Sequence, residues 1–191
     1  MKCGNNTFLK HLKNDNLPEN NLLFWDTSLP ASAIFQHKES DRRKAAIEFI
    51  DRLIKEKTYI AFSSVLFDEF IHIAIKNELM KAQLSRKESN RALSEKNERI
   101  IKPHIEDIQK NMTALNEILS KFKGNLRVIF PTESGIVAKA LELQCTHKLD
   151  RADSIHIATM LYGSQRDIAC FDTRDFGRVD GLNIWCKYGQ P

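Results

Sequence analysis

LDRADSIHIATML, at positions 149–161, and IACFDTRDF, at positions 168–176, are the stretches that decide the fold. The first is typical of a helix that opens with acids, and the second of a short apolar strand followed by two acids. Earlier runs with the composition of buried strands are LLFWD at 22–26, TYIAF at 58–62 and LRVIF at 126–130, and residues 182–185 close the series. Because helical stretches separate these runs, the sequence predicts an α/β fold with three layers, α/β/α, around a central parallel sheet.

Composition and charge are those of a globular domain. The chain has 191 residues, of which 42% are apolar and 28% charged, enough for one domain with a sizeable core. Its net charge of +4 is too small to indicate a partner. No stretch resembles a secretory signal or reaches the length of a membrane span, so we expect a cytoplasmic protein with no membrane partner. The cysteines include no C-x-x-C pair, which argues against a zinc ribbon or a redox dithiol.

The sequence divides into a polar extension, a domain and an insertion within that domain. Residues 1–21 contain six asparagines and no sustained hydrophobic period, so they are predicted to form a loosely held extension. Residues 22–191 form the domain, with an inserted helical hairpin at about 80–123. Residues 81–123 hold ten Lys or Arg and six acids, so this segment alone carries a charge of +4.

The insertion contains a polar helix and a second helix with an apolar seam. Ser85 and Glu88 have the spacing of a capping box for the polar helix. The seam residues recur at intervals of four and three: Ile101, Ile105, Ile108, Met112, Leu115, Leu119 and Phe122. Such a seam must be buried, either against the polar helix and the domain body or against a second copy of the chain.

Four acids from distant segments are predicted to meet at one edge of the sheet. Asp26 ends the first apolar strand and Asp172 follows the fourth, while Glu69 and Asp153 lie near the starts of two helices. In an open α/β sheet, ligands gather beyond the carboxyl ends of the strands. Clustered carboxylates repel one another unless a cation neutralises them, and oxygen ligands favour Mg²⁺ or Mn²⁺ over zinc. Such ions activate water and screen the charge of a phosphodiester.

Four motifs resemble, in this order, the acidic motifs of PIN-domain ribonucleases, many of which are toxins of bacterial toxin–antitoxin pairs: LLFWDTS, SSVLFDEF, DRADSIHIAT and CFDTRDF. The resemblance covers residues 22–185 apart from the basic insertion. It implies a PIN-like fold and a metal-dependent ribonuclease that leaves 5′-phosphate and 3′-hydroxyl ends.

The resemblance also implies roles for individual residues. The acids that it implies as catalytic and metal-binding are Asp26, Glu69, Asp153 and Asp172, with Asp175 as a further metal ligand. Thr27 or Ser28 would supply the hydroxyl beside the first acid. The implied partners are an RNA substrate, an antitoxin protein and a second copy of the chain. The chain departs from the family at Cys170 and Phe171, which stand where a Thr or Ser usually precedes the fourth acid, and in the length of its insertion.

Most of these acids also have an ordinary structural role open to them. Asp153 lies in the first turn of a helix behind an Asp150 cap, where an acid favours the helix dipole regardless of function. Asp172 and Asp175 are compatible with a turn. Asp26 has no such role, because the hydroxyls that follow it can cap the next helix.

Other functions are compatible with parts of the sequence. Arg151 and His156 have the R-x4-H spacing of the metal-independent HEPN ribonucleases, which are all-helical. His72 follows Glu69, and His156 follows Asp153, by three residues, a spacing seen in di-iron helix bundles. We expect both histidines to pack or to orient acids. A non-catalytic PIN-like module that binds RNA or protein is the remaining alternative.

The basic side chains Arg86, Lys87 and Arg91 are candidates for RNA contact, since cations beside an acidic metal site attract phosphates. The alternative for these side chains is an ordinary solvated helix face.

Overall fold

The computed structural model describes residues 7–12, 15–18, 21–35 and 40–186, and strands within these ranges form one parallel sheet. Its strands are β1 (Phe8–His11), β2 (Leu22–Trp25), β3 (Tyr59–Ser63), β4 (Leu126–Ile129), β5 (Asp167–Ala169) and β6 (Asn183–Cys186). Their order in the sheet is β1-β6-β5-β2-β3-β4, and each neighbouring pair is parallel. The predicted central parallel sheet is therefore confirmed.

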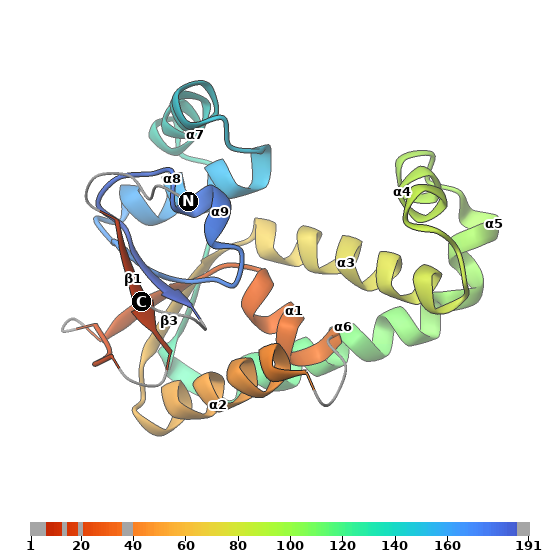
Figure 1. The fold of residues 1–191 in the computed structure, drawn as a ribbon, viewed down its shortest axis with the longest axis horizontal. Helices are drawn as coiled ribbons and strands as arrows, with labels where there is room; N and C mark the ends of the chain where they lie inside the picture. The colour runs from red at the N-terminus through yellow and green to blue at the C-terminus, as the bar shows by residue number, and fades with distance from the viewer. Residues whose placement is uncertain (1–6, 13–14, 19–20, 36–39, 187–191) are drawn as a thin grey trace.

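Helices cover both faces of this sheet (Figure 1). The helices on one face are α1 (Ser28–Phe35), α2 (Asp41–Lys55), α3 (Val65–Lys81) and α6 (Ile105–Ser120), and those on the other are α7 (Ser134–His147), α8 (Arg151–Tyr162) and α9 (Thr173–Phe176). Side chains alternate between the faces along each strand, so Leu23 and Trp25 enter one core and Phe24 the other. Strands buried on both faces need apolar residues at nearly every position, which explains the LLFW run. The three-layer α/β/α prediction is confirmed.

The helical insertion, which we call the arm (residues 80–123), projects from one side of the domain. Figure 1 shows α3 leaving the sheet, with α4 (Arg86–Ser94) and α5 (Glu98–Ile101) at its far end and α6 returning beside it. Two short 3₁₀ turns, Lys102–His104 and Lys123–Asn125, flank α6. The predicted capping box is present, since the Ser85 amide donates to Glu88 at 2.8 Å and the Glu88 amide donates to the Ser85 hydroxyl at 3.2 Å.

A buried carboxylate joins α6 of the arm to α3. Glu78 on α3 is 5% exposed and accepts hydrogen bonds from Asn111 on α6 at 3.0 Å and from Lys81 at 2.7 Å. A buried acid is tolerated only when it has such partners, so these contacts fix the position of α6 against α3.

The apolar seam of the arm is buried against the domain over its second half. Leu115, Leu119 and Phe122 belong to the core beside α1 and α3, and the Phe122 ring meets the Trp25 ring edge-on at a centroid distance of 5.2 Å. Ile105, near the outer end, is 44% exposed. The sequence allows the seam to be covered by the polar helix and the domain body or by a second copy of the chain. Over residues 115–122 the domain body covers it.

The amino-terminal extension corrects one prediction. Residues 8–11, expected to be loosely held, form β1 and pair in parallel with β6 at the edge of the sheet. The Thr7 hydroxyl also donates to the carbonyl of Val179 at 2.6 Å. A four-residue edge strand with mixed polarity has too short a pattern to be recognised in sequence. Residues 1–6, 13–14 and 19–20 of the extension lie outside the described ranges.

The connectivity of the sheet changes direction at β2. The chain proceeds from β2 to β3 and β4 on one side, whereas β5 and β6 lie on the other. Asp26 follows β2 directly, and its amide donates to the carbonyl of Ala169 at the end of β5 at 3.1 Å. The carboxyl ends of strands at such a switch in direction are the usual ligand position in open α/β sheets. Within the described ranges, no helix has both the length and the apolar character that a membrane crossing requires.

Candidate metal centre

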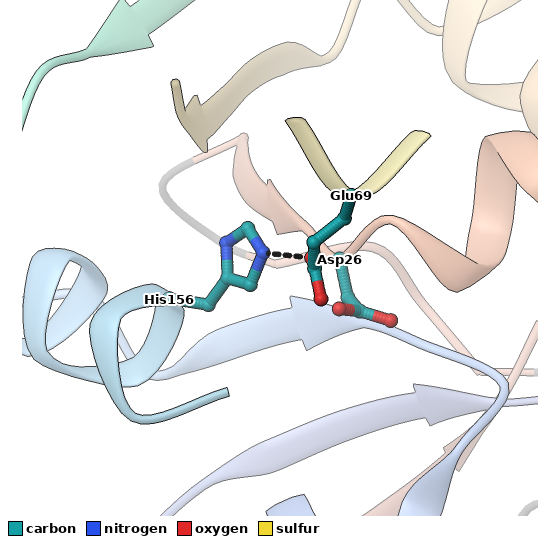
Figure 2. Close-up of side chains that lie close together, drawn as sticks. All are labelled: Asp26, Glu69 and His156. Carbon is teal, nitrogen blue, oxygen red and sulfur yellow. Dashed lines mark hydrogen bonds and ion pairs between the residues drawn. The ribbon is translucent and has the colours of Figure 1, made fainter. Parts of the chain in front are cut away.

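Three side chains from distant parts of the sequence meet beyond the end of β2. Asp26 follows β2, Glu69 lies in the second turn of α3, and His156 lies on α8 (Figure 2). Each offers one ligand atom, and these atoms all lie within 4.8 Å of one another. Asp26 is 5% exposed and His156 is completely buried. The structure therefore brings together two of the four predicted acids and adds a histidine.

Glu69 is held by two donors on the same oxygen. The Thr27 hydroxyl donates to Glu69 Oε2 at 2.6 Å, and His156 Nε2 lies 2.7 Å from that same atom. Of the two hydroxyls predicted to accompany Asp26, that of Thr27 thus serves the second acid. The sequence places His156 on the same helix face as Asp153, but its contact with Glu69, 87 positions away, comes from the packing of α8 beside α3.

Asp26 is held by the residue that begins α1. Its Oδ2 accepts hydrogen bonds from the Ser28 amide at 2.9 Å and from the Ser28 hydroxyl. The Ser28 hydroxyl oxygen in turn accepts a hydrogen bond from the amide of Phe171 at 2.8 Å. Ser28 therefore connects the first acid to the loop after β5, the segment in which Cys170 and Phe171 replace the family's hydroxyl residue.

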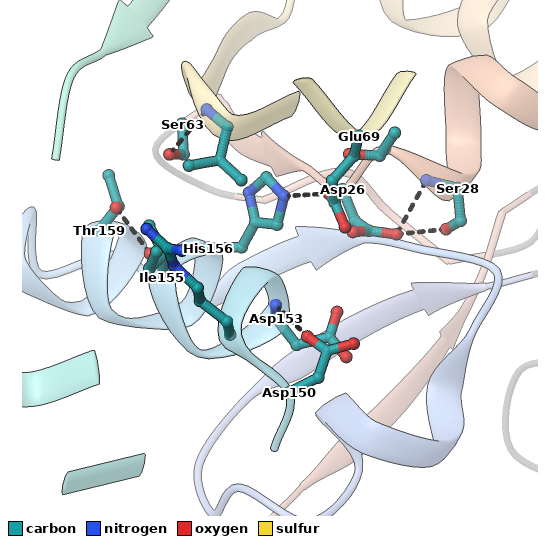
Figure 3. A network of polar contacts seen from close by, with 12 residues as sticks. Asp26, Ser28, Ser63, Glu69, Asp150, Asp153, Ile155, His156 and Thr159 are labelled. Carbon is teal, nitrogen blue, oxygen red and sulfur yellow. Dashed lines mark hydrogen bonds and ion pairs between the residues drawn. The ribbon is translucent and has the colours of Figure 1, made fainter. Parts of the chain in front are cut away.

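Asp153 lies in the first turn of α8, next to this cluster (Figure 3). Its amide donates to the side chain of Asp150, the N-cap of the helix, at 2.9 Å. Asp153 therefore has the first-turn position at which an acid interacts favourably with the helix dipole. Burial, followed by repulsion from Asp26, Asp150 and Glu69, raises the pKa of Asp153 to about 8. The Asp153 carboxylate is therefore in the field of the cluster, although it lies outside the group of ligand atoms within 4.8 Å.

The pKa values of the other ionisable groups of the cluster are shifted in different directions. Burial raises the pKa of Asp26, and the nearby His156 and Ser28 offset this only in part. Burial also acts to raise the pKa of Glu69, but the hydrogen bonds from His156 and Thr27 outweigh it and the pKa is lowered. Burial disfavours the charged form of His156, yet the contact with Glu69 and the charge of Asp26 raise its pKa.

This pattern fits a site for a hard divalent cation. Burial first, and repulsion between the carboxylates second, raise the pKa values of Asp26 and Asp153, so a bound cation would offset the cost of ionising both acids. The carboxylate oxygens of Asp26, Glu69 and Asp153 are the ligands that Mg²⁺ and Mn²⁺ prefer.

The acids of the fourth motif lie outside this group of ligand atoms, although the charge of Asp175 contributes to the raised pKa of Asp153. Asp172 is exposed and serves as the N-cap of α9, where its side chain accepts from the Arg174 amide at 3.3 Å. Asp175 forms an ion pair with Arg178 at 3.0 Å. The structure therefore does not bring either carboxylate into the Asp26, Glu69 and His156 group, and their metal-binding roles stay predictions.

The candidate RNA-binding residues lie on α4 at the far end of the arm. Arg86 and Lys87 are exposed, and Arg91 pairs with Glu95 on the same helix at 2.7 Å. An exposed pair of this kind contributes little to stability, so the contact leaves Arg91 free to exchange partners.

Two alternatives conflict with the fold. An HEPN-type enzyme is all-helical, whereas this chain has a parallel sheet, and His156 is buried and engaged by Glu69 instead of being open to a substrate. A di-iron bundle needs ligands from four long helices, whereas Asp26 follows a strand and His72 is exposed.

Comparison with known proteins finds a likeness among the solved structures. No protein-family model matches the chain, and no curated protein matches it. A solved structure of FitAB bound to the IR36 DNA fragment superposes with a TM-score of 0.47 and 17% identical residues. The match covers 88% of this chain and 97% of the other. A TM-score of this size carries no argument about function, so the fold assignment rests on the sheet itself.

Proposed function

We infer that this chain is a divalent-metal-dependent endoribonuclease of the PIN type. The observation that carries the proposal is the meeting of Asp26, Glu69 and His156 at the carboxyl end of the central strand, with the carboxylate of Asp153 close enough to be repelled by the first two. Carboxylates gathered at a switch point of a parallel sheet, with insufficient positive charge among them, favour a metal-dependent hydrolase over a binding module. The sequence motifs favour RNA as the substrate.

In this proposal Asp26, Glu69 and Asp153 hold Mg²⁺ or Mn²⁺, and Asp172 and Asp175 stay proposed as further metal-binding acids. When bound, the cation activates water and neutralises the charge that develops on the phosphodiester. Thr27 and Ser28 orient the carboxylates of Glu69 and Asp26 through the hydrogen bonds described above. An antitoxin protein and a second copy of the chain stay proposals as partners.

Metal-dependent cleavage tests the proposal directly. The purified protein is incubated with total RNA in Mn²⁺ or in EDTA, and the ends of the fragments are mapped. We expect cleavage only with the metal and 5′-phosphate ends on the products. Equal cleavage in EDTA, or 2′,3′-cyclic phosphate ends, would contradict the assignment.

The arm is proposed to bind the phosphates of the substrate. Reversing the charges of Arg86, Lys87 and Arg91 is expected to weaken RNA binding and to lower the slope of log K against log salt by roughly 0.7 for each phosphate that the protein no longer neutralises. Binding is measured by fluorescence anisotropy over a range of roughly 50 to 200 mM salt, on a background that does not cleave. Reversing Lys44 and Lys55, exposed on α2, is the control. A salt slope unchanged from the wild type would remove the arm from the RNA interface.

A further inference from the structure

We propose that His156 is a positioning residue that makes Glu69 a one-oxygen metal ligand, and that the chain uses the same device on Asp26. The inference rests on the proposed function, because it assigns the oxygen through which each carboxylate would meet the cation. It makes specific the sequence-based expectation that His156 packs or orients an acid, since it names the acid and the oxygen on which the histidine acts.

The hydrogen bonds to Glu69 all fall on one of its two oxygens. A carboxylate has about four lone-pair positions, two on each oxygen. Thr27 and His156 both contact Oε2, at 2.6 and 2.7 Å, and so occupy both positions on that atom. Within the part of the chain that the structure describes, Oε1 receives no hydrogen bond. Oε1 is therefore the oxygen left to bind a cation.

Asp26 shows the same arrangement through different donors. Its Oδ2 is engaged twice by Ser28, through the amide at 2.9 Å and through the hydroxyl. Its Oδ1 has no hydrogen-bond donor among the described residues. Asp26 and Glu69 thus each have one oxygen saturated by the protein and one left open. Each acid would therefore offer one oxygen to a cation, and neither would bind as a bidentate carboxylate.

His156 is suited to this role because its ring has no freedom to turn away. The side chain is 0% exposed, and α8 carries it toward α3 from the far side of the cluster (Figure 2). An ionised carboxylate only accepts, so the hydrogen in the contact with Glu69 belongs to Nε2. The other ring nitrogen, Nδ1, is on the opposite edge of the ring, buried and without a partner among the described residues. The imidazole thus acts on Glu69 through Nε2 and has no lone pair directed at the cation.

The energetic consequence follows from removing one donor. A leucine at position 156 would fill similar space but would leave Oε2 with the Thr27 hydroxyl alone. The Glu69 carboxylate could then rotate, and it would lose the free energy that the hydrogen bond from His156 contributes. Residues that hold a metal ligand in place typically contribute roughly ten- to hundredfold to metal affinity.

The experiment compares Mn²⁺ binding by the full-length wild type, His156→Leu and His156→Gln, with His72→Gln as a control on an exposed histidine of α3. Glutamine places an amide N–H near the position of Nε2 and so preserves the donor. We expect His156→Leu to weaken Mn²⁺ binding by roughly ten- to hundredfold. The Kd of His156→Gln for Mn²⁺ should stay within about threefold of the wild-type value, because the donor is preserved. The Kd of His72→Gln should equal that of the wild type. Electron spin-echo spectra of Mn²⁺ on the wild type should show no coupling to a histidine nitrogen.

Three outcomes separate this inference from the proposed function. Wild-type affinity in a folded His156→Leu protein would overturn the positioning role while leaving the metal site in place. A histidine-nitrogen coupling to Mn²⁺ bound by the wild type would also overturn the positioning role, because His156 would then be a ligand. This measurement does not depend on the folding of any variant. No Mn²⁺ binding by the wild type would refute the proposed function itself, and the inference with it.

Discussion

Replacement of Asp26 by Asn is expected to reduce RNA cleavage by roughly two to three orders of magnitude, which corresponds to about 2.7–4 kcal/mol of transition-state stabilisation. The variant keeps the size of the side chain and an oxygen that can accept from Ser28, but it removes the charge that would hold the cation. The fold should be retained, because burial already disfavours the charged form of Asp26. The same reduction in activity is expected for Asp153→Asn.

Single-turnover cleavage of a defined RNA in Mn²⁺ measures this effect, with circular dichroism as the check on folding. Asp68→Asn is the matched control, because Asp68 is an exposed acid that directly precedes Glu69 on α3. It should cleave at the wild-type rate. Wild-type rates in folded Asp26→Asn protein would show that the cluster does not carry the activity.

Stability of the metal-free protein is expected to fall as the pH rises, and added Mn²⁺ should reverse the fall. Asp153 has a pKa of about 8 in the folded protein, against about 3.9 in an unfolded chain. The folded state therefore binds the proton more tightly, so the stability from this group is complete below about pH 4 and is lost as the pH rises to 8. The raised pKa of His156 acts in the same direction. Glu69 has a lowered pKa, so its contribution is lost only in acid.

Asp153 is partly exposed, so solvent screening limits its share to about 1–3 kcal/mol, or roughly 2–10 °C in Tm for a chain of this size. Thermal unfolding at pH 6, 7, 8 and 9, in EDTA or in saturating Mn²⁺, measures it. Mn²⁺ at about a hundred times its Kd should restore about 2.7 kcal/mol. Asp153→Asn should unfold at a higher temperature than the wild type at pH 8 in EDTA and show a weaker pH dependence. A wild-type Tm that is flat from pH 6 to 9 would contradict the raised pKa.

Residues within regular patterns were open to prediction from the sequence. Asp26 ends an apolar run with the composition of a strand buried on both faces. Its place at the carboxyl end of that strand followed from the run itself. Ser85 and Glu88 form a local capping box, which depends only on neighbours three positions apart. The parallel sheet followed from the alternation of strand-like and helical stretches.

Contacts between distant segments were not open to prediction in the same way. The pairing of His156 with Glu69, and of the Ser28 hydroxyl with the Phe171 amide, depends on how α8, α3 and the loop after β5 pack. No local pattern specifies such distances. The sequence context of Asp172 allowed a metal ligand or a turn former, and only the three-dimensional arrangement shows that its side chain caps α9.

The continuity of α3 gives the arm a mechanical connection to the cluster. Glu69 lies near the sheet end of this helix and Lys81 ends it, a span of about 18 Å at roughly 1.5 Å per residue. An unbroken helix moves as a unit, so the second acid and the base of the arm belong to one rigid element. A partner that displaced the arm as a whole would act on the element that also carries the Glu69 carboxylate.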